Sequence, residues 1–393
     1  MNLRRDILDL IDQYLEIVNS DQNKENKKYW QNNYIHHWNR DMWRGVPKVD
    51  NEAIPFTVAL DNSLMSKVMK VDLREYYSDP ETYLETQLRM KIYHWENFND
   101  CTYFTDELFI WFGVITELSF FGAPIQFEPY KEAWISQNIL DDYKKLNALE
   151  SPDFYKSGLM PRIHQYYEVL NEYAQGKLKA MFPEWVRGPF CIATHLRETN
   201  NILMDLLLDP HNLHALMRLV VDWNKEWNRE RSKFLGTEVK GCRLYNDEIA
   251  YPSLSPAMFR EFVLPYEKEL GEHYGGVNYW HSCGDTTAYI EDIAELPNLL
   301  MFHCGPWTSF EKADKVFGEK AYTTLDVDLN PVSDVIEADK ETMVAKLKKI
   351  KDTCRTTPYA VRADAFMPDG PTDYIIKQIK VWIEAAREVL GTK

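Results

Sequence analysis

A histidine and a cysteine stand two positions apart at the end of a short apolar stretch, residues 277–284 (VNYWHSCG). Residues i and i+2 of a strand point to the same face, so His281 and Cys283 would emerge side by side. Imidazole nitrogen and thiolate sulfur are zinc ligands, and a catalytic zinc needs one more protein ligand while a position stays open for substrate. The alternative is a half-buried strand whose histidine bonds to a backbone carbonyl and whose cysteine fills space.

Polar and ionisable residues follow other apolar stretches in the same way. We expect strands at 188–193, 241–245, 277–280, 299–302, 321–325 and 359–361. The residues at or after their ends are Thr194, His195, Asp247, Glu248, His281, Cys283, His303, Cys304, Asp326, Asp328, Arg362 and Asp364. A lone H-x-C pair is a weak signal, whereas this repeated pattern is more specific.

Helical periodicity fills the intervals between these stretches. Helices are predicted at 200–208, 212–235, from Ser255, around 290–293, around 343–350 and at 372–389. Ser255 would cap its helix, with Pro256 at the first position. Short strands alternating with helices imply a parallel sheet with right-handed crossovers. Six such units after residue 180, with room for two before it, predict a (β/α)8 TIM barrel, in which the loops after the strand ends form the active site.

The first part of the chain has a different pattern from the alternating strands and helices after residue 180. An amphipathic helix is predicted at 2–20, and loops rich in aromatic residues, Trp111 among them, fill 101–135. We interpret residues 1–150 as an N-terminal helical and cap region packed on the barrel, and 151–393 as the main part of the barrel, within one structural domain. The aromatic residues suit a hydrophobic substrate pocket, an ordinary core or a subunit interface.

Composition limits the possible partners. The 393 residues carry a formal charge of −16 and contain no basic block, which argues against binding of nucleic acid or anionic membranes. No apolar run reaches 18 residues, and the N-terminus lacks an apolar signal core. Six scattered cysteines favour free thiols or metal ligands over disulfides. These features predict a cytoplasmic protein, and a homodimer is one arrangement that they allow.

Four motifs resemble the uroporphyrinogen decarboxylase superfamily. They are 188–190 (GPF) with 195–197 (HLR) downstream, 255–266 (SPAMFREFVLPY), 281–284 (HSCG) and 305–307 (GPW). The resemblance covers about residues 180–393 and implies a TIM barrel. The superfamily also includes cobalamin-dependent methyltransferases.

The branch of the superfamily depends on two regions. True uroporphyrinogen decarboxylases carry an Arg-rich N-terminal motif for a polyanionic tetrapyrrole, and residues 38–44 (WNRDMWR) do not match it. The H-x-C pair resembles the zinc motif of the methyltransferase branch. Coenzyme M methyltransferases add a second cysteine near the end of the last strand, where this chain has 363–368 (ADAFMP). Glu248, Cys304 or Asp364 is then the candidate third ligand.

Methyltransferases of anaerobic O-demethylases are similar to this superfamily and are thought to bind zinc with glutamate and histidine. This chain has Glu248, Glu261 and His281 in an order along the sequence that is compatible with such a zinc site. The alternative for Glu261 is a residue on the surface of a helix. The resemblance therefore implies a zinc site made by His281, Cys283 and Glu248, with Cys304 as a further candidate. His303 and Cys304 are adjacent in a strand, so only one of them can face the barrel mouth.

The remaining residues have predicted roles around that zinc. Asp247, Asp326 and Asp364 are candidates for proton transfer, and Arg362 either pairs with a substrate carboxylate or forms a structural ion pair. The predicted substrate contacts are His195, His303, Asp328 and Trp111. An open zinc position could polarise the ether or amine atom that leaves when cob(I)alamin takes a methyl group.

The sequence thus predicts a zinc-dependent methyltransferase that moves a methyl group between a small O- or N-methylated compound, aromatic ones included, and a corrinoid protein. The alternative is a metal-independent decarboxylase or lyase that acts on a small carboxylated substrate through Arg362 and the acidic residues. A binding barrel without catalysis is a third hypothesis. Neither nucleic acid nor a membrane is an expected partner.

Overall fold

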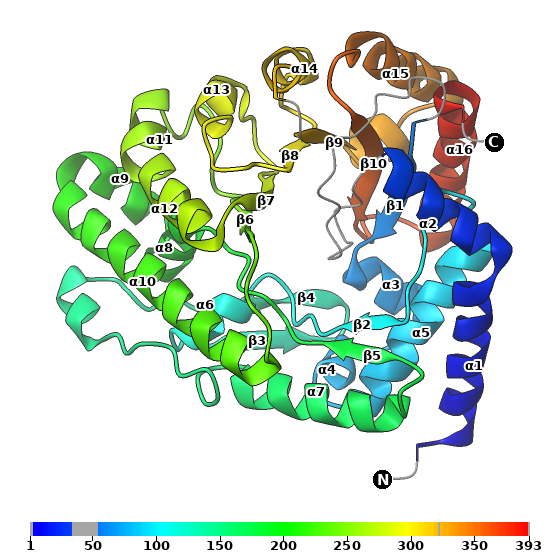
Figure 1. The fold of residues 1–393 in the computed structure, drawn as a ribbon, viewed down its shortest axis with the longest axis horizontal. Coiled ribbons are helices and arrows are strands. Elements are labelled where there is room, and N and C mark those ends of the chain that lie inside the picture. The colour runs from blue at the N-terminus through cyan, green and yellow to red at the C-terminus, as the bar shows by residue number, and fades with distance from the viewer. Residues whose placement is uncertain (1–2, 34–53, 321–322, 392–393) are drawn as a thin grey trace.

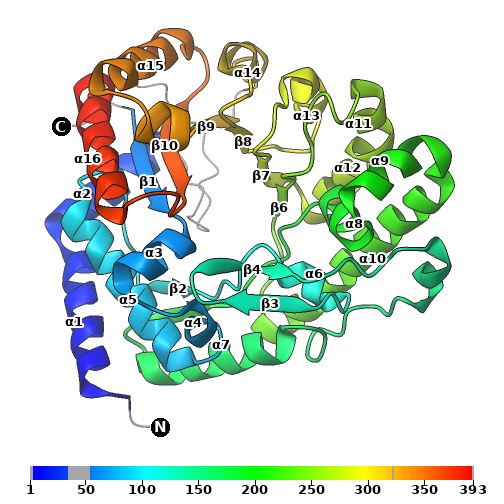
Figure 2. The same ribbon diagram turned by 180° about the vertical axis from the view of Figure 1, so that it is seen from behind.

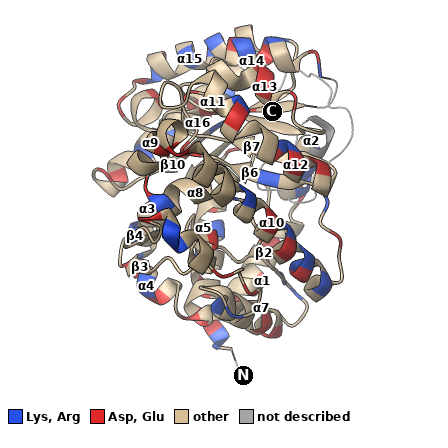
Figure 3. Cartoon of the chain, turned by 90° about the vertical axis from the view of Figure 1, so that its left-hand side faces the viewer, with Lys and Arg blue, Asp and Glu red and all other residues tan. Residues whose placement is uncertain are grey.

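A computed structural model describes residues 3–33, 54–320 and 323–391. Residues 38–44, whose sequence does not match the tetrapyrrole motif, lie outside these ranges. Among the described residues, no helix has the length and apolar character needed to cross a membrane. Acidic and basic residues are interspersed over the outer helices (Figure 3).

Parallel strands form the centre of the fold. Six of them make one sheet in the order β1 (Phe56–Leu60), β10 (Tyr359–Phe366), β9 (Thr324–Leu329), β8 (Met301–Cys304), β7 (Val277–His281) and β6 (Cys242–Tyr245), and β2 (Glu107–Phe109) pairs with β5 (Lys179–Met181). A parallel bridge between Arg187 and Tyr245 joins the segment after β5 to β6. The Cys101 N–H donates to the Phe56 carbonyl at 2.9 Å, which joins β1 to the segment before β2. This ring confirms the predicted (β/α)8 TIM barrel (Figure 1).

Helices surround the ring of strands (Figure 1). They are α1 (Arg5–Asn19), α2 (Asp21–Asn33), α3 (Asn62–Met69), α4 (Leu73–Tyr76), α5 (Pro80–Asn97), α6 (Thr116–Phe120), α7 (Met160–Ala174), α8 (Pro189–Arg197), α9 (Thr199–Leu208), α10 (Pro210–Leu235), α11 (Pro256–Phe262), α12 (Leu264–Tyr274), α13 (Ile290–Ile293), α14 (Phe310–Phe317), α15 (Lys340–Thr353) and α16 (Thr372–Leu390). A hairpin of β3 (Ile125–Glu128) and β4 (Lys131–Ile135) packs against α3 and α4 (Figure 2). Residues 1–150 thus supply β1 and β2 of the barrel as well as helices and this hairpin.

Each helix predicted after residue 180 has a counterpart in the structure, in α9, α10, α11, α13, α15 and α16. The Ser255 side chain accepts from the Met258 N–H at 3.2 Å, which confirms this residue as the cap of α11. The predicted strand at 188–193 is wrong, because Pro189 begins helix α8 instead. Proline at the first position of a helix is favourable, since its missing N–H is not needed there.

Strands β9 and β10 are longer than predicted, and this changes where four charged residues lie. Asp326 and Asp328 are inside β9, and Arg362 and Asp364 are inside β10, instead of following the strands. Each pair has i, i+2 spacing and so shares one face. The register pairs Arg362 with Asp328 across the two strands. Parallel strand pairing thus brings charges of opposite sign together within the barrel.

Glu267 of α12 links two of the segments that carry candidate site residues. Its fully buried carboxyl accepts hydrogen bonds from Asn246 Nδ2 at 2.7 Å and from Trp280 Nε1 at 2.8 Å. Asn246 precedes Asp247, and Trp280 precedes His281. Burial raises the pKa of Glu267 to about 7, although both hydrogen bonds favour the ionised form.

The Glu267→Gln variant should differ from the wild type in how its stability depends on pH. A carboxyl whose pKa is raised in the folded state contributes fully below its unfolded pKa of about 4.3 and loses that contribution as the pH rises through 7. Between these limits the wild type should lose up to about 3 kcal/mol relative to the variant. Urea unfolding of both proteins from pH 4.5 to pH 8 measures this difference, and parallel curves would contradict the prediction.

Candidate active site

His281, Cys283 and Asp247 form a group of potential metal donors at the barrel mouth, called here the His281 group. His281 ends β7 and pairs in register with Tyr245, so the segment that follows β6 lies beside it. His281 Nε2 lies 3.1 Å from Asp247 Oδ1 and 3.4 Å from Cys283 Sγ, and the three donor atoms lie within 4.8 Å of one another. The predicted emergence of His281 and Cys283 on one side is confirmed.

The turn after Cys283 depends on a glycine. A Cβ atom at Gly284 would lie 2.4 Å from the Cβ of Ala250, which is closer than two carbon atoms can approach. Glycine therefore allows the segment that carries Cys283 to approach the segment that carries Asp247. This close approach brings donors from two strand ends together.

Hydrogen bonds to Tyr279 orient the His281 ring. The Tyr279 hydroxyl donates its only hydrogen to Asp326 Oδ2 at 2.7 Å, so towards His281 Nδ1, 3.2 Å away, its oxygen acts as the acceptor. The hydrogen of a neutral His281 ring then lies on Nδ1. The Nε2 lone pair faces Asp247 and Cys283, as in histidines that bind metal and are held by an outer carboxylate or hydroxyl.

The charges in the His281 group favour a cation. Burial opposes ionisation of Asp247, but its hydrogen bond with His281 and the charges of His281 and Arg187 hold its pKa well below the usual range. Desolvation and the neighbouring carboxylates raise the pKa of Cys283. Without a cation Cys283 is therefore a thiol, and a bound metal ion would reverse this by stabilising the thiolate.

A second group of donors adjoins the first one and consists of Cys191, His195 and Glu248. Cys191 and His195 are one turn apart on α8, and His195 Nε2 lies 2.5 Å from Glu248 Oε1. The buried Arg187 lies between the two groups, with Nη1 2.7 Å from Cys191 Sγ and 3.4 Å from Asp247 Oδ2. In the second group the guanidinium contacts a donor atom itself, Cys191 Sγ, whereas in the His281 group it contacts Asp247 Oδ2 and not the donor oxygen Oδ1. A metal cation is therefore repelled more strongly in the second group.

Arg362 is the centre of a third group, called here the Arg362 cluster. Its guanidinium lies 3.3 Å from Asp326 Oδ2, 3.4 Å from Asp328 Oδ2 and 2.5 Å from Asp364 Oδ2. Burial raises the pKa values of Asp328 and of Asp364 to about 6 each, against the opposing effect of Arg362. The predicted structural ion pair of Arg362 is therefore present and involves all three aspartates.

His303 connects the Arg362 cluster to the His281 group. Its Nδ1 lies 2.8 Å from the Ser282 carbonyl oxygen, and its Nε2 lies 3.2 Å from Asp328 Oδ2. The rings of His303 and His281 are stacked with their centroids 4.0 Å apart. Burial and the adjacent His281 and Arg362 lower the pKa of His303 well below 6.5. Of the two adjacent candidates on β8, His303 is thus the one beside the site.

Two predicted zinc ligands are not in the His281 group. Cys304 is buried, with Sγ 3.8 Å from the Thr308 carbonyl oxygen, because it points to the opposite face of β8 from His303. Glu248 lies in the second group with His195, and Asp247, predicted for proton transfer, takes the place beside His281 and Cys283. Glu261, the other glutamate considered as a zinc ligand, is exposed on α11, with its carboxyl 3.8 Å from His214.

Two further residues, His195 and Trp111, were predicted to contact the substrate. His195 meets the ring of Trp134 edge to face at 5.3 Å. Trp111 follows β2 and is half-buried, and its main-chain N–H donates to the Tyr83 hydroxyl at 2.9 Å. The role of Trp111 in substrate binding stays a prediction.

Sequence reasoning missed Arg187, Cys191 and Tyr279. A signal existed for Tyr279, because it stands two positions before His281 and so shares its strand face. The i, i+4 relation of Cys191 and His195 was hidden when that segment was interpreted as a strand. Nothing local in the sequence marks Arg187, whose partners come from α8 and from the segment after β6.

Comparisons with known proteins agree with the barrel fold. The profile of the family Uroporphyrinogen decarboxylase (URO-D) matches residues 48–362, so the family resemblance begins well before residue 180, where the sequence motifs began. A methyltransferase from Methanosarcina mazei has a similar structure, with a TM-score of 0.61 and 13% identity over 86% of this chain and 95% of that chain. At this identity the likeness concerns the fold. No curated protein matches the chain by sequence.

Arg362→Met should destabilise the protein strongly at pH 8 and less at pH 5. Removal of one partner from a buried ion pair costs about 3–5 kcal/mol, because the remaining charges stay buried without compensation. Protonation of Asp328 and Asp364, whose pKa values are already raised to about 6, relieves that cost in acid. Urea unfolding at both pH values measures the effect, with the exposed Arg74, paired with Asp72, changed to Met as the control. An equal loss at both pH values would contradict the prediction.

Proposed function

This chain belongs to the uroporphyrinogen decarboxylase family, and we propose that it is a zinc-dependent methyltransferase that transfers a methyl group from a small O- or N-methylated compound to a corrinoid protein. The observation that carries the proposal is the convergence of His281 Nε2, Cys283 Sγ and Asp247 Oδ1 within 4.8 Å. A nitrogen, a sulfur and an oxygen donor match the ligand preferences of zinc, and three protein ligands leave one position for substrate.

Two further observations support the fit of a metal ion to these residues. Asp247 Oδ1 is buried, and its polar neighbours His281 Nε2 and Cys283 Sγ are themselves metal donors, so a metal ion between the three would replace these contacts. The Asp326, Tyr279 and His281 chain holds the imidazole with Nε2 directed at the other two donors. We therefore propose Asp247 as the third ligand in place of Glu248.

The proposed chemistry assigns a task to each group of residues. A zinc ion bound there would act as a Lewis acid on the oxygen or nitrogen atom from which the methyl group leaves. Arg187 holds Asp247 in place, and Tyr279 holds His281. The Arg362 cluster lies next to the metal donors and carries carboxyls that exchange a proton near neutral pH. These carboxyls are suited to supply the proton that the leaving atom needs.

The structurally similar protein from Methanosarcina mazei is a methyltransferase, which favours the same class of reaction. The alternative decarboxylase or lyase needs Arg362 to bind a substrate carboxylate. Because three aspartates already surround Arg362, a fourth carboxylate would meet net negative charge. The structure thus favours the methyltransferase over that alternative.

Metal content and methyl transfer test the proposal together. We expect about one zinc per chain in the purified protein and none in the His281→Ala, Cys283→Ala double variant, because two of three ligands are lost. Methyl transfer from methoxylated compounds and methylated amines to free cob(I)alamin should be present in the zinc-containing wild type and absent from the zinc-free double variant. A fully active, metal-free protein would overturn the proposal, and carbon dioxide release without a corrinoid would support the alternative.

Tyr279→Phe should weaken zinc binding while it preserves the fold. Loss of an outer hydrogen-bond partner of a ligating histidine typically costs 10–100-fold in metal affinity. Competition with a coloured chelator measures that affinity. The matched control is Tyr289→Phe, since the Tyr289 hydroxyl is also buried but donates to the Leu254 carbonyl. Equal affinities in the two variants would show that Tyr279 does not position His281.

A further inference from the structure

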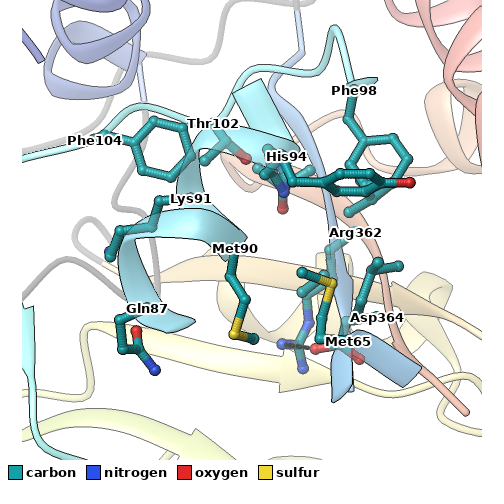
Figure 4. Close-up of a pocket in the computed structure, with 15 residues that line it drawn as sticks. Met65, Gln87, Met90, Lys91, His94, Phe98, Thr102, Phe104, Arg362 and Asp364 are labelled. Atoms are coloured by element: carbon teal, nitrogen blue, oxygen red, sulfur yellow. Dashed lines mark hydrogen bonds and ion pairs between the residues drawn. The ribbon is translucent and has the colours of Figure 1, made fainter. Parts of the chain in front are cut away.

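A cavity of about 210 Å³ lies beside the Arg362 cluster, between β1, α3 and α5 (Figure 4). Apolar side chains form most of its wall, among them Met65, Met90, Phe98 and Phe104. Arg362 and Asp364 line one end of it, and Figure 4 shows this ion pair next to Met65. An engineered apolar cavity of about 150 Å³ binds benzene, so this space is sufficient for one substituted six-membered ring.

The carboxyl groups at this end of the cavity are placed to share a proton. Arg362 Nη2 lies 3.4 Å from Asp328 Oδ2 and Arg362 Nη1 lies 2.5 Å from Asp364 Oδ2, so one guanidinium holds both carboxyls. Like charges held this close repel each other, and together with burial this favours a protonated carboxyl in the pair, with the pKa of each raised to about 6. Asp364 is the member that faces the cavity.

Neighbouring groups hold this pair in position from every side. Arg362 of β10 contacts both carboxyls, Asp326 lies on the same strand as Asp328, and His303 of β8 meets Asp328 at 3.2 Å. The His303 Nδ1 donates to a carbonyl oxygen, so its Nε2 is the atom directed at Asp328. His281 of β7 adds a weaker electrostatic effect, and Lys91 and His94 of α5 also line the cavity.

We propose that this cavity binds the apolar body of a small substrate, and that Asp364 donates the proton of the Asp328–Asp364 pair to the substrate atom that faces it. The substrate class is a small, largely apolar molecule, up to the size of one substituted ring, that carries a hydrogen-bond acceptor. The proposal rests on the proposed function only for the identity of the bond that breaks.

For a methyl ether, a methyl group and a proton are transferred. The bond between the methyl carbon and oxygen breaks, and oxygen keeps the electron pair and takes the proton from Asp364. The methyl carbon passes to the cobalt(I) of the corrinoid partner, which supplies the electron pair of the new bond. The Asp328–Asp364 pair then recovers a proton from solvent. An amine nitrogen would take the proton in the same way.

Two small probes test the cavity and the proton separately. Methoxybenzene, followed by equilibrium dialysis, should bind the wild type, and Met90→Trp should weaken it at least tenfold because indole fills the space. Met258→Trp is the matched control, since Met258 is a half-buried helical methionine of α11, away from the cavity. No binding to the wild type, or equal binding to the Met90→Trp variant, would overturn the proposed cavity.

4-Nitrophenol reports on the proton, because its phenol and phenolate forms absorb at different wavelengths. At a pH where the free probe is mostly ionised, the wild type should bind it with the phenol spectrum. Asp364→Asn and Asp328→Asn keep the apolar wall and should still bind methoxybenzene, but they should either bind 4-nitrophenol as phenolate or lose it. An unchanged phenol spectrum in both variants would overturn the proton donation. Neither probe needs zinc, corrinoid or turnover, so a failure of the proposed function would be seen separately.

Discussion

The buried guanidinium of Arg362 is the interaction on which the other groups at the barrel mouth depend. Arg362 forms ion pairs with three aspartates from two neighbouring strands. Each of these aspartates also contacts a different part of the site. Asp326 accepts a hydrogen bond from Tyr279, and the Tyr279 hydroxyl also contacts His281. Asp328 contacts His303, and Asp364 lines the cavity. A buried charge must be paired to be tolerated. The requirement to pair Arg362 therefore also fixes the positions of the side chains that would bind metal and move a proton.

The balance of charge at the mouth explains why a metal ion fits there. Five carboxyl groups, those of Asp247, Glu248, Asp326, Asp328 and Asp364, face the guanidinium groups of Arg187 and Arg362. The excess of negative charge is reduced in two ways. The raised pKa values of Asp328 and Asp364 favour protonation of this pair. A divalent cation in the His281 group would neutralise more of the excess, next to Asp247, which keeps its charge.

Much of the fold and part of the site could be predicted from the sequence. The alternation of strands and helices gave the barrel, and period-two spacing gave the shared face of His281 and Cys283. Two details depend on geometry that no such pattern contains. Asp247 and Glu248 are adjacent after β6, and the course of the chain beyond the strand decides which one meets His281. The pattern of the apolar run after Gly188 fits a strand and a helix equally well. In the structure this run is helix α8, with Pro189 at its first position.

The two arginines also divide the mouth into parts with different chemistry. Arg187 neutralises Asp247 and Glu248 on the side of α8, and its contact with Cys191 opposes a second metal ion there. Arg362 keeps Asp326 next to Tyr279, so the carboxylate acts on His281 through a hydroxyl and does not compete for the metal. A cation can then bind on one side while a proton is stored on the other. The two sides adjoin each other, because the rings of His281 on one side and His303 on the other are stacked with their centroids 4.0 Å apart.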